Sequence, residues 1–132
     1  MSTAINFLEA SIAELKKYKS LGERTFQQLN DEEMHFQPNA MVNSIAVNIR
    51  HMHGNMQSRW TRFLQEDGEK SWRRRDEEFQ KPDLNKEQLI LLWDEGWTTV
   101  FNTLSSLRKK DLRKTITIRN QPLTVPEAIS RQ

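Results

Sequence analysis

His51 and His53 are the side chains of this sequence best suited to binding a metal ion, and they lie in the stretch HMHGNM. Imidazole nitrogen is a common ligand of zinc and similar ions. Side chains two residues apart share a face on a β-strand, but on an α-helix they diverge by about 200° around the axis. Whether both histidines can serve one ion therefore depends on the element that carries them.

The residues around the two histidines predict a helix. Ser44 offers an N-cap, and apolar residues follow in steps of three and four: Ile45, Ile49, Met52, Met56, Trp60 and Phe63. Met52 lies on this apolar face, so His51 and His53 flank it on opposite sides and cannot chelate one ion together. The alternative to a ligand role for His51 is a half-buried imidazole bonded to a backbone carbonyl, Asn48 or Asn55.

Composition narrows the classes of function. The chain has 132 residues, which is typical of one domain spanning 1–132. It has no cysteine, which excludes thiolate nucleophiles and thiolate metal sites. The net charge of +2 is too small to indicate nucleic-acid binding. The sequence contains neither a signal peptide pattern nor an apolar run long enough to span a bilayer, so we expect a cytoplasmic protein without membrane contact.

The remaining apolar pattern predicts two more long helices and a hairpin. One helix covers residues 4 to 28, with Ser2 or Thr3 as N-cap. Residues 29–43 form a connection with room for one helical turn at 31–34, and polar residues 66–82 form a second, longer connection. A helix begins at Asn85, where Gln88 completes a capping box, and its apolar face runs to Leu107, with Lys109 and Lys110 near its end.

The C-terminal segment predicts a β-hairpin followed by a helix. Residues 115–118 alternate as a strand does, and 123–125 follow across Arg119, Asn120 and Gln121. Thr124 and Glu127 then form a capping-box pattern with Pro126 in the first turn, so a helix starts at residue 125. A helix of about one and a half turns would be marginal alone.

This order of segments resembles the DinB-like superfamily, closest to a bacterial branch of unknown function. The resemblance rests on SIAVNIRHMHGNMQSRW at 44–60, DGEKSWRRRDEEF at 67–79 and TITIRNQPLTVPEAISRQ at 115–132. It implies an all-α fold: an up-down-down-up four-helix bundle with a long crossover between the second and third helices. A short β-hairpin precedes the fourth helix, which is incomplete in these 132 residues.

The resemblance also implies a metal site. Many members bind one divalent metal, such as Zn or Ni, through one histidine of the second helix and two of the fourth, and the second-helix ligand falls at His51. The other two would lie beyond Gln132, so we expect no tight site in the 132 residues themselves. Asn55, one turn after His51, and Asn48 are candidates to orient the imidazole.

Two functions from different classes follow. In the first, a longer form of the protein is a metal-dependent transferase that uses a low-molecular-weight thiol as cosubstrate. In the second, the protein is a non-catalytic helical bundle that acts by association. Because the fourth helix is incomplete in these 132 residues, the first three helices would expose apolar faces, so we expect a homodimer or a recruited helix.

The charged run WRRRDEEF in the second connection has two readings. Trp72 beside Arg73, Arg74 and Arg75 could hold phosphate or nucleic acid. The acidic residues that follow at 76–78 instead favour a solvated face or internal ion pairs. We therefore expect no nucleic-acid partner.

Overall fold

Three long helices and a short C-terminal helix make up most of the protein. The computed structural model describes residues 2–132. The long helices are α1 (Thr3–Gln27), α3 (Ile45–Trp60) and α4 (Lys86–Ser106), and the short ones are α2 (Asp31–His35) and α5 (Val125–Ser130). Two 3₁₀ helices, η1 (Asp76–Phe79) and η2 (Lys109–Arg113), and a hairpin of β1 (Thr115–Ile118) and β2 (Gln121–Thr124) complete the chain.

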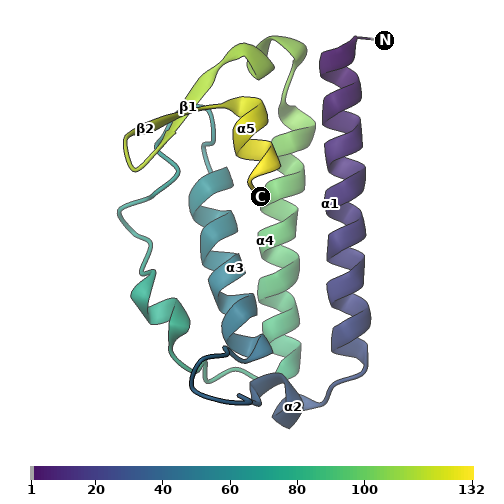
Figure 1. Ribbon diagram of the computed structural model, residues 1–132, viewed down its shortest axis with the longest axis vertical. Helices are drawn as coiled ribbons and strands as arrows, with labels where there is room; N and C mark the ends of the chain where they lie inside the picture. The colour runs from purple at the N-terminus through teal and green to yellow at the C-terminus, as the bar shows by residue number, and fades with distance from the viewer. Residues whose placement is uncertain (1) are drawn as a thin grey trace.

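The helices run in the order of directions that the resemblance implies. Figure 1 shows α1 descending, α3 and α4 both ascending, and α5 descending in front of α4. The crossover from α3 to α4, residues 61–85, passes down the outer side of α3 (Figure 1). With α5 only six residues long, the described residues form three main helices, a hairpin and a C-terminal helix rather than a complete four-helix bundle.

The predicted helix starts are confirmed. The Ser2, Ser44 and Thr124 hydroxyls accept hydrogen bonds from backbone N–H groups three residues on, as N-caps do. Asn85 and Gln88 form the predicted reciprocal capping box. Glu127 differs in part, because its carboxylate accepts from the hydroxyl of Thr124 rather than from the backbone.

Two predicted helix ends are wrong. The helix bearing the histidines ends at Trp60 rather than reaching Phe63, because Thr61 has an extended backbone with ψ of 127°, and Arg62 then adopts a left-handed conformation with φ of 47°. Phe63 is still buried, stacked on Trp60 at 4.6 Å between ring centroids. The third long helix ends at Ser106, so Lys109 and Lys110 belong to η2 instead of its last turn.

The hairpin turn is also one residue shorter than predicted. Ile118 pairs with Gln121, so Arg119 and Asn120 alone form the turn. Both have positive φ, 52° and 64°, as a two-residue type I′ hairpin requires. Positive φ is favourable for asparagine and less so for arginine.

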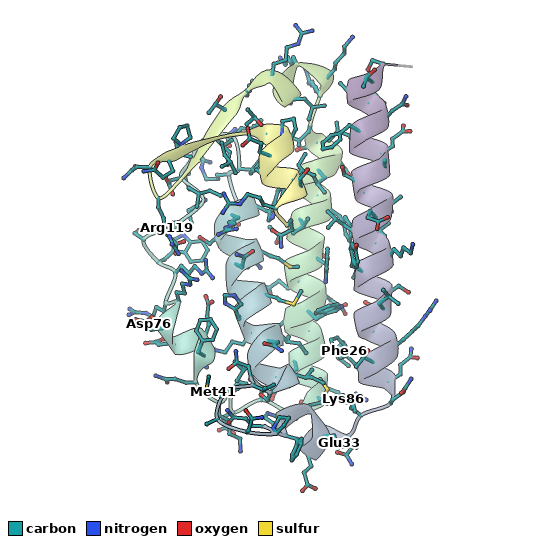
Figure 2. The ribbon with its side chains drawn as sticks, in the orientation of Figure 1. Phe26, Glu33, Met41, Asp76, Lys86 and Arg119 are labelled. Carbon is teal, nitrogen blue, oxygen red and sulfur yellow. The ribbon has the colours of Figure 1, made fainter. Side chains whose placement is uncertain are left out.

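The core lies between α3 and α4 and is closed by α1 on one side. Phe26, near the lower end of α1 in Figure 2, meets Trp93 edge-on at 4.9 Å between centroids. Trp93 in turn contacts Trp97, which stacks on Phe101. The fully buried side chains include Trp60, Met34, Ile49, Met56, Leu89, Leu104, Val100 and Val125. No helix among residues 2–132 is both long and apolar enough to cross a bilayer.

Buried polar contacts hold the first part of the crossover on α3. The Ser58 hydroxyl donates to the Gly68 carbonyl at 2.6 Å, and the Lys70 ammonium donates to the carbonyls of Ser58 and Asp67. Burial lowers the pKa of Lys70. These contacts determine where the rest of the crossover meets α3.

Asp67 joins the crossover to the hairpin. Its carboxylate accepts hydrogen bonds from the backbone N–H groups of Glu69, Arg119 and Asn120, each at 2.8 Å. Partial burial alone would raise the pKa of Asp67, but these hydrogen bonds lower it far below the usual range. The two N–H groups at the hairpin turn are thereby satisfied by a side chain that lies 52 and 53 residues earlier in the chain.

Candidate functional site

His51 meets an ion pair that the crossover brings to α3. Its Nδ1 lies 3.0 Å from Oε1 of Glu78 in η1, and its ring lies 4.7 Å from that of Phe79. Glu78 also accepts two hydrogen bonds from the guanidinium of Arg73, at 2.9 Å to Oε2 and 3.0 Å to Oε1. A carboxylate accepts, so Nδ1 carries a proton, and the tautomer protonated at Nδ1 has its lone pair on Nε2.

The ion pair is almost completely removed from solvent. The side chain of Arg73 is 2% exposed, that of Glu78 is 8% exposed, and that of His51 is 31% exposed. Burial alone would raise the pKa of Glu78, but hydrogen bonds from Arg73 and His51 outweigh burial and lower it. Glu78 is therefore a buried carboxylate held ionised, with its position determined from two sides.

Gly54 makes room for this carboxylate. A Cβ atom at residue 54 would lie 2.0 Å from Oε2 of Glu78, far closer than any contact allows. Glycine in the interior of a helix costs about 1 kcal/mol relative to alanine. Because Gly54 has no side chain, Glu78 packs directly on the backbone of α3.

The partner of His51 is a residue that sequence reasoning missed. Asn48 is exposed and Asn55 is half-buried, and the imidazole bonds to Glu78 rather than to either of them. The acidic run at 76–78 does not reveal which carboxylate is buried. The interior glycine of HMHGNM is the one local signal that another segment approaches α3 closely.

His53 belongs to a separate hydrogen-bond network between α3 and α4. Its Nε2 lies 3.1 Å from Oε1 of Glu95 in α4, and the Gln57 amide donates to the same oxygen at 2.7 Å. The Thr99 hydroxyl donates to Oε1 of the Gln57 side chain at 2.7 Å. The two histidines of HMHGNM thus have different partners, on the crossover and on α4. The third histidine, His35, is half-buried at the end of α2 and contacts the Asp31 carbonyl.

The basic triplet is divided between interior and surface. Arg73 is buried in its pair with Glu78, while Arg74, Arg75 and Trp72 are exposed, Trp72 by 56%. The Arg73–Glu78 contact is an internal ion pair of the kind that the acidic residues after the arginines favoured. Because Arg73 is buried in this pair, it is not available on the surface to bind nucleic acid.

A groove of about 400 Å³ lies below the end of α5, between α1 and α3. Its walls are Leu15 and Tyr18 of α1 and Met52 and Met56 of α3, and Trp97 of α4 also lines it. Ile129 closes it at the α5 end. Trp97 Nε1 is buried without an acceptor among residues 2–132. The groove is mainly apolar and is continuous with the surface on which α5 packs.

A metal cage is not assembled from the described residues. Within residues 2–132, no three His, Asp or Glu side chains converge as an ion would require. A lone imidazole does not hold zinc, which takes three or four protein ligands. His51 and Glu78 therefore fit one ligand and its orienting partner, and not a whole site.

Comparison with known families gives one match. Residues 2–132 match the family model described as "Protein of unknown function (DUF1572)". The chain belongs to this family. No curated protein and no solved structure matches the chain. Membership in the DUF1572 family therefore assigns the chain a group of relatives without assigning it an activity.

Proposed function

We propose that this DUF1572 chain is a DinB-like helical module that acts by association, and that a second copy of the chain covers the groove beside α5. The observation that carries the proposal is the apolar groove lined by Leu15, Tyr18, Met52, Met56 and Trp97. The order of helix directions and the long crossover support the DinB-like assignment.

The choice of a second copy rests on self-complementarity. The edge of the groove on α1 carries protruding apolar side chains, because Tyr18 is 55% exposed and Leu21, one turn further, is 48% exposed. A two-fold axis places the same patch of two copies face to face, so the protruding residues of one copy meet the hollow of the other. Burying such side chains stabilises an interface by roughly 1.5–3 kcal/mol each.

Sedimentation of matched variants tests this proposal. Leu21→Glu places a charge at the proposed interface and is expected to shift the protein from dimer to monomer. Leu91→Glu is the control, because Leu91 is 67% exposed on α4 and does not line the groove. A monomeric wild type, or equal dissociation by both variants, would refute the second copy as occupant.

A second candidate function is supported by the contact between His51 and Glu78. Histidines that bind metal usually donate their other ring N–H to a carboxylate, which orients the ring and raises its basicity. Glu78 holds Nδ1 of His51 in this manner and leaves Nε2 as the ligating atom. His51 is thus proposed as one ligand of a Zn or Ni site. The thiol-cosubstrate transferase activity implied by the resemblance depends on such a site.

The metal proposal is tested on the protein with every residue that its gene encodes, purified without an affinity tag. Elemental analysis is expected to find near-stoichiometric metal in the wild type and in His53→Ala, and little in His51→Ala. Glu78→Gln is expected to lower metal affinity by about 10-fold to 100-fold, as loss of an orienting partner does. Equal retention of metal in both histidine variants would exclude His51 as a ligand.

A further inference from the structure

Four arginines from distant parts of the sequence converge where the crossover meets the hairpin and α5. Arg59 is in the last turn of α3, Arg73 is in the crossover, Arg119 is in the hairpin turn and Arg131 follows α5. Figure 2 shows Arg119 at the tip of the hairpin, on the side of the crossover.

Contacts of Arg59, Arg73 and Arg119, and of the residues that follow Arg59 and Arg131, place the four arginines in one region. The Trp60 indole N–H donates to the Gln132 side chain at 2.8 Å. Trp60 follows Arg59 and Gln132 follows Arg131, so this hydrogen bond joins the two segments that carry these arginines. A Cβ atom at Gly68 would lie 3.6 Å from Cγ of Arg59, so the Arg59 side chain lies against the crossover. Oε2 of Glu69 lies 3.5 Å from Nη1 of Arg73 and 3.4 Å from Nε of Arg119.

The protein neutralises the positive charge of this cluster only in part. Arg73 is paired with Glu78, and the Asp67 carboxylate accepts hydrogen bonds from backbone N–H groups of the crossover and the hairpin turn rather than from a guanidinium. Glu69 remains as the carboxylate near the others, and its contacts with Arg73 and Arg119 are long. Within residues 2–132, neither Arg59 nor Arg131 forms a salt bridge, and Nε of Arg59 is buried without a partner.

The pKa of Arg59 reflects the same excess of charge. Burial lowers the pKa of Arg59, and the charges of Arg131, Arg73 and Arg119 lower it further, against a single opposing contribution from Glu69. An anion placed among these groups would relieve the repulsion.

We propose that Arg59, Arg119 and Arg131 form a binding site for a small soluble phosphate, as inorganic phosphate or a phosphate monoester. Guanidinium groups donate in a planar fork that matches phosphate oxygens, and three of them from separate elements can surround a tetrahedral dianion. Arg119 and Arg131 are exposed and Arg59 is half-buried, so the ligand enters from solvent and binds the terminal nitrogens. Glu69 is the competing acceptor, because it already contacts Arg119.

Titration with inorganic phosphate, followed by calorimetry at constant ionic strength set with sodium chloride, tests the site. The wild type is expected to bind saturably. Arg131→Gln and Arg119→Gln, at exposed positions where the fold tolerates change, are each expected to weaken binding about 10-fold, as loss of one charge-assisted contact predicts. Arg24→Gln is the control, because Arg24 is exposed on α1, remote from the cluster.

Glu69→Gln separates a binding role from a structural one. Removal of the competing carboxylate is expected to tighten phosphate binding several-fold, whereas a cluster that only supports the fold would gain no affinity. The proposal is overturned if phosphate binds no better than chloride, or if Arg24→Gln weakens binding as much as Arg131→Gln. Failure of Glu69→Gln to strengthen binding would also count against it.

Discussion

Substitution of Glu78 by glutamine should destabilise the protein more than any other single change of charge in the crossover. The glutamine side chain has the shape of glutamate, so the change removes the charge without opening a cavity. It leaves the Arg73 guanidinium, 2% exposed, with the longer contact to Glu69 at 3.5 Å as its remaining ion pair. It also replaces an acceptor oxygen shared with His51 or Arg73 by an amide that donates.

The expected loss follows from this burial. Removing one partner of a buried ion pair costs about 3–5 kcal/mol. One amide oxygen can still accept from Arg73, so we expect the lower end, about 3 kcal/mol. For a domain of this length that corresponds to a fall in Tm of roughly 10 °C. Domains are typically stable by about 5–15 kcal/mol, so the variant should still fold.

Urea unfolding at pH 7, followed by tryptophan fluorescence and by circular dichroism, measures the change. Glu77→Gln is the matched control, because Glu77 is the adjacent residue, has the same side chain and is exposed. It should change the free energy of unfolding by no more than about 0.5 kcal/mol. Arg73→Met and the double variant complete a cycle that isolates the coupling between the two side chains.

A small effect would refute this reasoning. A loss below about 1 kcal/mol in Glu78→Gln, within the range of an exposed ion pair, would mean that the Arg73–Glu78 pair is solvated in solution. Equal effects of Glu77→Gln and Glu78→Gln would show that the crossover does not hold residue 78 against α3.

Two further predictions concern Asp67 and the interior glycines. Asp67→Asn should lower the free energy of unfolding at pH 7, and the difference from the wild type should narrow as the pH falls from about 5 towards 2. The pKa of Asp67 is lowered in the folded state, so its contribution to stability is present above the pKa of about 3.9 in the unfolded state and is lost on acidification. Urea unfolding of both proteins across this pH range measures the gap, and a constant gap would contradict the assignment. Gly54→Ala should destabilise the protein by about 1–3 kcal/mol despite better helix propensity, because Glu78 is held from two sides. Gly96→Ala should cost less, because its one tight contact would be with the Met56 sulfur at 2.9 Å, while His53 Cα and Met56 Cβ would lie at an ordinary 3.6 Å. The reverse order in thermal unfolding would show that Glu78 moves freely.

The helix starts were predictable because they depend on neighbours in the chain. Ser44, Asn85 and Thr124 cap their helices through N–H groups three residues away, so the residue types alone indicate the position. The separation of His51 from His53 follows from the same local geometry, since residues two apart on a helix diverge. Helix ends were less predictable: the backbone becomes extended at Thr61, so α3 ends before its apolar pattern does.

The partner of His51 could not be read from the sequence, because it lies 27 residues away across a polar connection. Glu77 and Glu78 are the same residue type in one acidic run, yet one is exposed and the other is buried. The difference arises from the path of the crossover, which Ser58, Lys70 and Asp67 hold against α3 and the hairpin. Local hydrogen bonding therefore predicts the helices and the directions of their side chains, whereas long-range packing determines which charge is desolvated and which histidine it orients.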